Sequence, residues 1–190
     1  YVEDGVADAG IIGENIFVEK GKDIAVILKL GFSKCRLSLA IPKALEYNGL
    51  QYFNGLSIAT SYPKTLTNFL NQNFIQADIH EISGSVEIAP GIGLADAVCD
   101  IVSSGSTLIT NGLKEVEIIL QSEAVLVSNK NLGEIKKTIL NDLLFRIEAV
   151  HHAKNNKYIL LNAPNDKLQE IIEILPGIKS PTIIPLALSG

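Results

Sequence analysis

The fold and the candidate site both depend on one stretch, Asp96-Ala97-Val98-Cys99-Asp100-Ile101-Val102-Ser103-Ser104-Gly105-Ser106-Thr107. Its apolar run, interrupted only by Asp100, predicts a buried strand. The loop after it offers backbone N–H groups, hydroxyls and a glycine that lets a ligand approach the backbone. Such a loop at the carboxyl end of a strand predicts a phosphate site, with Asp100 placed to accept hydrogen bonds from sugar hydroxyls. The alternative is an ordinary serine and glycine turn beside a solvated aspartate.

The composition argues against several classes of protein. The 190 residues are 47% hydrophobic and 19% charged, which is typical of a globular chain, and the net charge is −5. Without a basic patch, we expect no nucleic-acid partner. No apolar run approaches the ~20 residues of a membrane span, so we expect no membrane partner. Cys35 and Cys99 lack disulfide-framework or CxxC spacing, which is typical of a reducing compartment and predicts a cytoplasmic protein.

Apolar runs separated by turn residues predict strands that alternate with helices, and hence α/β layers around mostly parallel sheets. We expect strands at 8–12, 24–30, 35–41, 55–60, 76–82, 97–102, 115–120 and 124–128. We expect a helix end at 2–7, helices at 64–73 and 132–150, and a final strand–helix–strand unit at 157–163, 166–174 and 182–186. Ligands gather at the carboxyl ends of strands in such folds, so the candidate loops are 13–15, 61–63 and 103–107.

One short pattern occurs twice in the chain. Gly5-Val6-Ala7-Asp8-Ala9 matches Gly93-Leu94-Ala95-Asp96-Ala97 in the spacing of its glycine, alanines and aspartate. Both predict a helix end, a tight turn and a buried strand. The recurrence predicts two lobes that each use the same unit.

A second acid accompanies the opening stretch. Glu87 lies thirteen positions before Asp100, and a turn and a helix end separate the two. Two carboxylates beside a phosphate loop suit a ribose, because they accept short hydrogen bonds from its hydroxyls and stabilise positive charge on its ring. The alternative is that Glu87 caps a helix and Asp100 is a solvated strand end.

These motifs, in this order, resemble ATP phosphoribosyltransferase, the enzyme of the first step of histidine biosynthesis. The resemblance covers almost the whole chain and is carried by residues 4–8, 10–15, 35–40, 58–63, 84–90, 93–97, 100–108, 111–113, 157–159, 163–164, 175–177 and 180–186. The last of these groups resemble the long form, which has a C-terminal regulatory domain.

The resemblance implies an α/β fold: a two-lobed catalytic core like a type II periplasmic binding protein, followed by the first half of a ferredoxin-like α+β regulatory domain. Residues 1–32 and 119–154 would form the first lobe, 33–118 the second lobe with the phosphate loop, and 155–190 the start of the regulatory domain. The family's N-terminal segment and the second half of its regulatory domain are not expected in this chain. Whether the chain is active by itself stays open.

The resemblance also implies the chemistry. Phosphoribosyl would pass from phosphoribosyl pyrophosphate to N1 of ATP, releasing pyrophosphate, with Mg²⁺ accompanying the pyrophosphate. Glu87 and Asp100 would be the catalytic acids on the ribose. The loop residues that would hold the 5-phosphate are Ser103, Ser104, Gly105, Ser106 and Thr107. Weaker candidates for contact with ATP or pyrophosphate are Glu14, Arg36, Thr60, Ser61 and Tyr62.

Regulation and assembly follow from the same resemblance. Histidine and AMP are the expected regulators of the full-length protein, and a dimer or hexamer of identical chains is the expected assembly. The alternative function is a two-lobed module that binds a solute or anion without catalysis. Such a module needs a cleft and an anion loop but no acid pair beside the loop.

Overall fold

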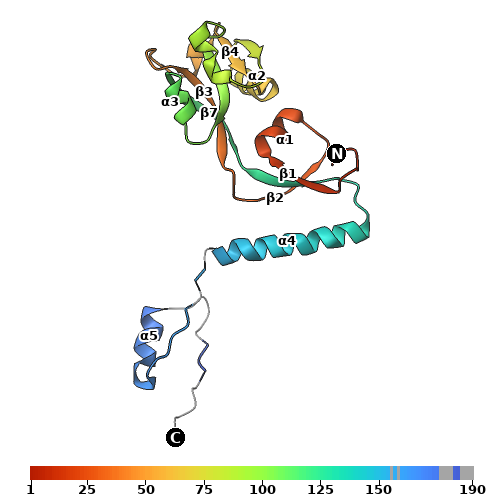
Figure 1. Cartoon of the computed structure of the whole chain (residues 1–190), viewed down its shortest axis with the longest axis vertical. Coiled ribbons are helices and arrows are strands. Elements are labelled where there is room, and N and C mark those ends of the chain that lie inside the picture. Colours follow the sequence, from red (N-terminus) through yellow and green to blue (C-terminus); the bar gives the residue numbers. More distant parts are fainter. Residues whose placement is uncertain (155, 158, 176–181, 185–190) are drawn as a thin grey trace. The chain divides into compact units, whose positions relative to one another are not determined.

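The computed structural model describes residues 1–154, 156–157, 159–175 and 182–184 (Figure 1). The chain divides into two compact units, Tyr1–Asp142 and Leu143–Gly190. The first unit contains two sheets, and the candidate residues all lie in it.

The smaller sheet has three antiparallel strands in the order β1-β8-β2. Their bounds are Ala9–Gly13 for β1, Ala124–Ser128 for β8 and Ala25–Lys29 for β2. Helix α1 (Glu14–Lys20) begins directly after β1. The central strand β8 is buried along its whole length, which is why all five of its residues are apolar or small.

The larger sheet has five strands in the order β5-β4-β6-β3-β7. Their bounds are Asp78–Glu81 for β5, Ser57–Thr60 for β4, Ala97–Val102 for β6, Cys35–Pro42 for β3 and Leu113–Ser122 for β7. Its helices are α2 (Pro63–Gln72), α3 (Ser106–Thr110) and the short 3₁₀ turns η1 (Leu50–Phe53), η2 (Val86–Ile88) and η3 (Pro90–Ile92).

Strand alternation divides the core of the larger sheet between its two faces. On β6, Cys99 packs with Leu66 and Leu70 of α2, whereas Val98 and Val102 pack with Val86 of η2 and with Leu108. Because side chains alternate along a strand, Asp100 shares the second face with Val98 and Val102. The acid therefore lies on the face that η2 covers.

The expectation of mostly parallel sheets is wrong. Among the strands of the described residues, only β4 pairs in parallel, with β5 and β6, and the other strand pairs are antiparallel. The reason is that β3 carries the chain into the larger sheet and β7 carries it back out, so these neighbours run in opposite directions. The parallel trio β5-β4-β6 nevertheless forms one half of the larger sheet.

Most predicted elements are present, with two exceptions in the first unit. The expected strands in residues 8–128 match β1 to β8, and α2 matches the expected helix. Residues 2–7 form turns and bends instead of a helix end, and helix α1 was not expected. The twice-used pattern has a structural counterpart, since Gly5 and Gly93 have left-handed φ values of 74° and 73°.

The second unit is described by itself. Helix α4 (Glu134–Lys154), which begins in the first unit, matches the expected helix but buries none of its residues. A 3₁₀ turn η4 (Asn165–Lys167) leads into α5 (Leu168–Ile174), as expected. The described residues of the expected strands at 157–163 and 182–186 form no strand, and the others lie outside the described residues. The ferredoxin-like half domain stays a prediction.

Among the described residues, no helix combines the length and the apolar character that crossing a membrane requires.

Candidate functional site

The three parallel strands bring three predicted segments to one edge of the larger sheet. Thr60, at the end of β4, lies opposite Glu81 of β5 and Cys99 of β6. The segments that follow these strands therefore start on the same side of the sheet. They are the turn at 61–63, the segment at 83–89 with Glu87, and the loop at 103–107.

Asp100 and Glu87 lie near each other at this edge. Asp100 is half-buried, and burial raises the pKa of its carboxyl, with a further increase from the negative charge of Glu87. One oxygen of Asp100 accepts a hydrogen bond from the backbone N–H of Ile101 at 2.8 Å. The structure thus brings together the two acids that the sequence predicts as a pair.

A tight turn and two buried anchors position Glu87. Gly84 and Ser85 have left-handed φ values of 77° and 52°, which reverses the chain before η2. Val86 and Ala89 are buried in the core on either side of the acid. Because Ser85 is not a glycine, its backbone conformation stores local strain next to the acid pair, as functional sites often do.

The loop at 103–107 joins a buried strand to a buried helix residue. Val102 before it is 2% exposed and Leu108 after it is 6% exposed, whereas no side chain between them is buried. Gly105 has a φ of 81° and precedes α3. The Ser104 and Ser106 hydroxyl oxygens lie 2.9 Å apart, so two hydroxyls of this exposed loop already gather at one point.

The turn after β4 reaches helix α1 of the smaller sheet. The Tyr62 hydroxyl accepts a hydrogen bond from Asn15 Nδ2 at 2.9 Å, and burial raises its pKa, with the charge of Asp100 adding to the shift. Ser61 Oγ donates to the carbonyl of Ile82 at 2.6 Å, which ties the ends of β4 and β5 together. Thr60 is fully buried, and its hydroxyl accepts a hydrogen bond from the Tyr62 N–H.

Two other predicted residues are already paired with a charge. Glu14 accepts from Lys29 Nζ at 2.9 Å. Arg36 donates to both carboxylate oxygens of Glu115 at 2.5 Å and to the carbonyl of Ser103 at 3.2 Å. Arg36 therefore contacts the first residue of the loop.

The sequence pointed to the loop at 13–15 but not to the partners that connect α1 to the larger sheet, nor to Glu19. Asn15 exchanges hydrogen bonds with Ser122 Oγ at 3.0 Å, across 107 positions of the chain. Glu19 is 6% exposed and accepts three hydrogen bonds from Lys64 and Thr65 at the start of α2. A buried acid has no recognisable pattern in a single sequence. The one available signal was Pro63, which marks the start of a helix without a local capping side chain.

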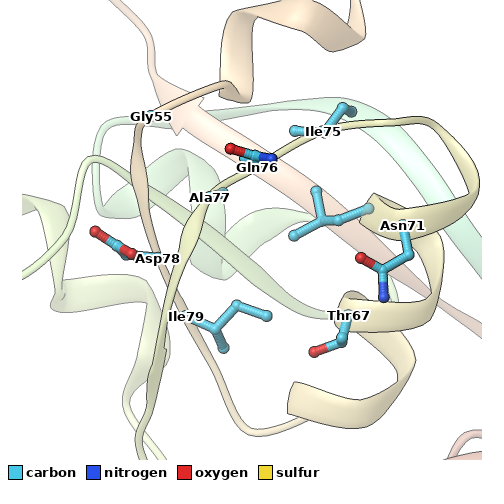
Figure 2. A pocket seen from close by; sticks show the side chains of 9 residues that line it. Gly55, Thr67, Asn71, Ile75, Gln76, Ala77, Asp78 and Ile79 are labelled. Carbon is cyan, nitrogen blue, oxygen red and sulfur yellow. The ribbon is translucent and has the colours of Figure 1, made fainter.

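A hollow elsewhere in the larger sheet is separate from this edge. Figure 2 shows its lining: Gly55 before β4, the residues from Ile75 to Ile79 that lead into β5, and residues of α2. These residues lie at the amino ends of the parallel strands, opposite the acids and the loop. Among the described residues, no three histidine, cysteine, aspartate or glutamate side chains gather as a metal site would require.

Known structures with a similar fold support a class assignment. A substrate-binding protein of an amino acid ABC transporter superposes with a TM-score of 0.59 at 11% identity, over 80% of this chain and 69% of that chain. The ligand-binding core of GluR0 gives 0.52 at 15% identity, over 80% and 72%. The fold is therefore that of a two-lobed α/β protein of the periplasmic-binding-protein type, here with an acid pair beside a hydroxyl-rich loop.

Matches to one family cover nearly the whole chain. The family model described as ATP phosphoribosyltransferase matches residues 1–149, and the model described as the HisG C-terminal domain matches residues 153–190. Curated ATP phosphoribosyltransferases of Phocaeicola vulgatus and Bacteroides thetaiotaomicron are 64% and 62% identical over 189 residues, which is 100% of this chain and 67% of each relative. The HisG:HisZ complex of Thermotoga maritima contains a chain with a TM-score of 0.69 at 27% identity, over 79% of this chain and 73% of that chain.

The chain belongs to the ATP phosphoribosyltransferase family, whose members are pentosyltransferases of the first step of histidine biosynthesis. This confirms the family that the motifs predicted. The chain spans about two thirds of the length of these curated relatives.

Proposed function

We propose that the edge formed by the ends of β4, β5 and β6 is where phosphoribosyl passes from phosphoribosyl pyrophosphate to N1 of ATP. The observation that supports this most is the convergence of Asp100, Glu87 and the loop at 103–107 at the carboxyl ends of neighbouring strands. Family membership supports the reaction, and the geometry supports the proposed roles of these residues.

The loop at 103–107 binds the 5-phosphate of phosphoribosyl pyrophosphate. Its side chains are exposed or half-buried, and the Ser104 and Ser106 hydroxyls lie close together. Gly105 keeps the centre of the loop free of a side chain, so that phosphate oxygens approach the backbone. These features suit an anion site that works by local hydrogen bonds. The net charge of −5 means that the protein as a whole does not attract anions.

Asp100 and Glu87 bind the ribose hydroxyls next to this phosphate. When pyrophosphate leaves C1, positive charge develops on the ribose ring, and two carboxylates at a half-buried edge stabilise it. Adenine N1 supplies the electron pair that forms the new bond to C1, and the pyrophosphate oxygen takes the pair from the broken bond. Catalysis then rests on positioning and charge, without a covalent enzyme intermediate.

ATP and pyrophosphate contacts come from the second group of predicted residues. The Tyr62 hydroxyl accepts a hydrogen bond from Asn15 and keeps its own proton to donate to a ligand. Ser61, next to Tyr62, and Glu14, next to Asn15, are half-buried. Thr60 acts from the core, since its hydroxyl supports the backbone of this turn. Arg36, the remaining member of this group, is bonded to Glu115 and to the carbonyl of Ser103, so it belongs with the phosphate loop rather than with ATP.

Mg²⁺ fits this site as a companion of the pyrophosphate. The described residues offer the acid pair but no cluster of three ligands, and Mg²⁺ is usually held by one or two carboxylates together with substrate phosphates and water. When bound, the ion would neutralise charge on the leaving pyrophosphate. Asp100 and Glu87 are the groups that would hold it.

The domain limits are proposed on the same basis. Residues 1–32 and 119–154 form the first catalytic lobe and residues 33–118 the second, consistent with the two sheets and with family coverage of 1–149. Residues 155–190 begin the regulatory domain, in agreement with the match of the C-terminal domain from 153.

Assembly and regulation belong to the intact protein. We infer a cytoplasmic homo-oligomer, a dimer or a hexamer, with histidine and AMP as regulators. The relative from Thermotoga maritima was solved in a complex of two kinds of chain, which supports assembly in this family.

The test is Asp100→Ala in the intact protein, assayed for turnover of phosphoribosyl pyrophosphate with ATP. We expect a loss of at least about a hundredfold with the fold preserved, because the half-buried carboxylate proposed to stabilise the positive charge on the ribose is removed. Asp78→Ala is the matched control, since it removes an exposed acid at the opposite end of the same sheet. Near-normal turnover in Asp100→Ala would remove the acid from the mechanism, and ligand binding without any turnover in the wild type would favour the solute-binding alternative.

A further inference from the structure

A side chain on β3 connects the core of the larger sheet to the phosphate loop. Arg36 lies opposite Val102, the last residue of β6, in the antiparallel register of these strands. Its guanidinium extends past that strand end, and Nη1 donates to the carbonyl oxygen of Ser103 at 3.2 Å. The first backbone carbonyl of the loop is therefore held by a neighbouring strand.

The guanidinium itself is held from the other side. Arg36 Nε and Nη2 donate to the two carboxylate oxygens of Glu115 on β7, each at 2.5 Å. Ser38 is 1% exposed, and its hydroxyl donates to the same carboxylate at 2.7 Å. The pKa of the Glu115 carboxyl is lowered chiefly by its hydrogen bonds with Arg36, so the pair is ionised at neutral pH. A buried serine thus anchors the ion pair to the sheet.

The loop depends on such polar contacts for its position. Between Val102 and Leu108 it has no buried side chain, so apolar packing does not fix it. Its ends are fixed by those two core residues, and the five residues between them need hydrogen bonds to hold one conformation. Arg36 supplies one at the first of the five.

We propose that Arg36, held by Glu115, is a positioning residue that fixes the Ser103 carbonyl and thereby orients the loop's N–H groups and hydroxyls toward the 5-phosphate. This rests on the proposed function of the loop. It assigns Arg36 a role that acts through the loop, with Glu115 as a necessary partner.

Only an arginine has the shape for this arrangement. A planar guanidinium can present Nε and Nη2 to one carboxylate while Nη1 points to a third acceptor. A lysine keeps the positive charge but has a single nitrogen, so it cannot hold both carboxylate oxygens and the carbonyl in one plane. Arg36→Lys therefore separates geometry from charge.

The experiment measures kcat and KM for both substrates, and phosphoribosyl pyrophosphate binding by calorimetry, in the intact protein. For Arg36→Lys we expect the KM and the dissociation constant for phosphoribosyl pyrophosphate to rise by about tenfold, the factor of one lost charge-assisted hydrogen bond. The KM for ATP and kcat change by less than about threefold. Arg36→Lys with Glu115→Gln is expected to be no weaker than the worse single variant, because both changes break one unit.

Glu115→Gln distinguishes positioning from direct contact with substrate. If Arg36 acts through the loop, releasing it from Glu115 weakens phosphoribosyl pyrophosphate binding although the positive charge remains. If Arg36 instead contacts the pyrophosphate, loss of the competing carboxylate leaves binding unchanged or strengthens it, and the proposal is overturned. Glu117→Gln is the matched control. Glu117 lies on β7 with Glu115 but accepts its hydrogen bond from Tyr47, at 2.6 Å, so this change should leave the KM unchanged.

The outcomes separate this proposal from the proposed function. A wild-type protein that binds no phosphoribosyl pyrophosphate overturns both. Normal wild-type binding, with Arg36→Lys and Glu115→Gln both matching Glu117→Gln, overturns the positioning role alone.

Discussion

Replacing Glu19 with alanine removes the contact that joins helix α1 to the start of helix α2. The Glu19 carboxylate accepts from the N–H groups of Lys64 and Thr65 at 3.0 and 2.9 Å, and from the Thr65 hydroxyl at 2.7 Å. No side chain of α2 itself caps its first turn, where Tyr62 is the N-cap residue. A side chain from α1 thus performs the capping that helices usually obtain locally.

The expected cost follows from these three bonds. Hydrogen bonds to a charged acceptor contribute about 1.5–3 kcal/mol each before the penalty of burying the charge, and loss of an N-cap costs about 0.5–2 kcal/mol. Glu19 is 6% exposed, so its desolvation offsets part of the gain. We expect Glu19→Ala to lower the free energy of unfolding by about 3 kcal/mol and Glu19→Gln by about 1–2 kcal/mol, since the amide oxygen still accepts.

The pH dependence gives a second, independent signal. Burial raises the pKa of Glu19, but the hydrogen bonds from Thr65 and Lys64 outweigh it and leave the pKa below its usual range. A carboxyl whose pKa is depressed on folding contributes stability above its unfolded pKa, and that stability is lost as the pH falls through the folded value. The gap between wild type and Glu19→Gln should therefore be constant near neutral pH and shrink in acid.

Urea unfolding of the intact protein and of both variants, from pH 7 down to pH 3, measures these differences. Glu14→Gln is a matched control, because Glu14 lies on the same helix but pairs with an exposed lysine. A cost below about 1 kcal/mol for Glu19→Ala, or parallel pH curves for wild type and Glu19→Gln, would refute the capping role.

Three further predictions concern the site and the core. Because burial and the charge of Glu87 raise the pKa of Asp100, kcat/KM should fall on acidification at a higher pH than for an ordinary aspartate, and Glu87→Gln should move that limb of the pH profile to lower pH. Gly105→Ala should weaken phosphoribosyl pyrophosphate binding, measured by calorimetry, by about fivefold, because alanine is strained at a φ of 81°. The added Cβ would not clash, since its nearest neighbour, in Val102, is 3.8 Å away. Unchanged affinity would contradict this prediction. Leu66→Ala, at a fully buried position, should cost about 3 kcal/mol in urea unfolding, and a cost near zero would mean that α2 is not packed as described.

The opening stretch shows how far local pattern reaches. The apolar, β-branched run at residues 97–102 predicted strand β6 with its observed bounds, because a short run of this kind that ends at turn residues is typical of a buried strand. The loop after it, Gly105 at its centre and Glu87 upstream were also identified from the sequence. Helix α1 was missed because seven residues are too few to show a helical period.

The sequence by itself determined the strands, the loop and the motifs, since each depends on neighbours in the chain. The tertiary structure alone decided which strands run parallel, and hence that Glu87 and Asp100 lie near each other at one edge. It also decided that Glu19 caps α2 and that Arg36 pairs with Glu115 and reaches Ser103. These contacts join residues 45 to 79 positions apart, and they depend on strand register and on the packing of α1 against α2, which no local pattern encodes.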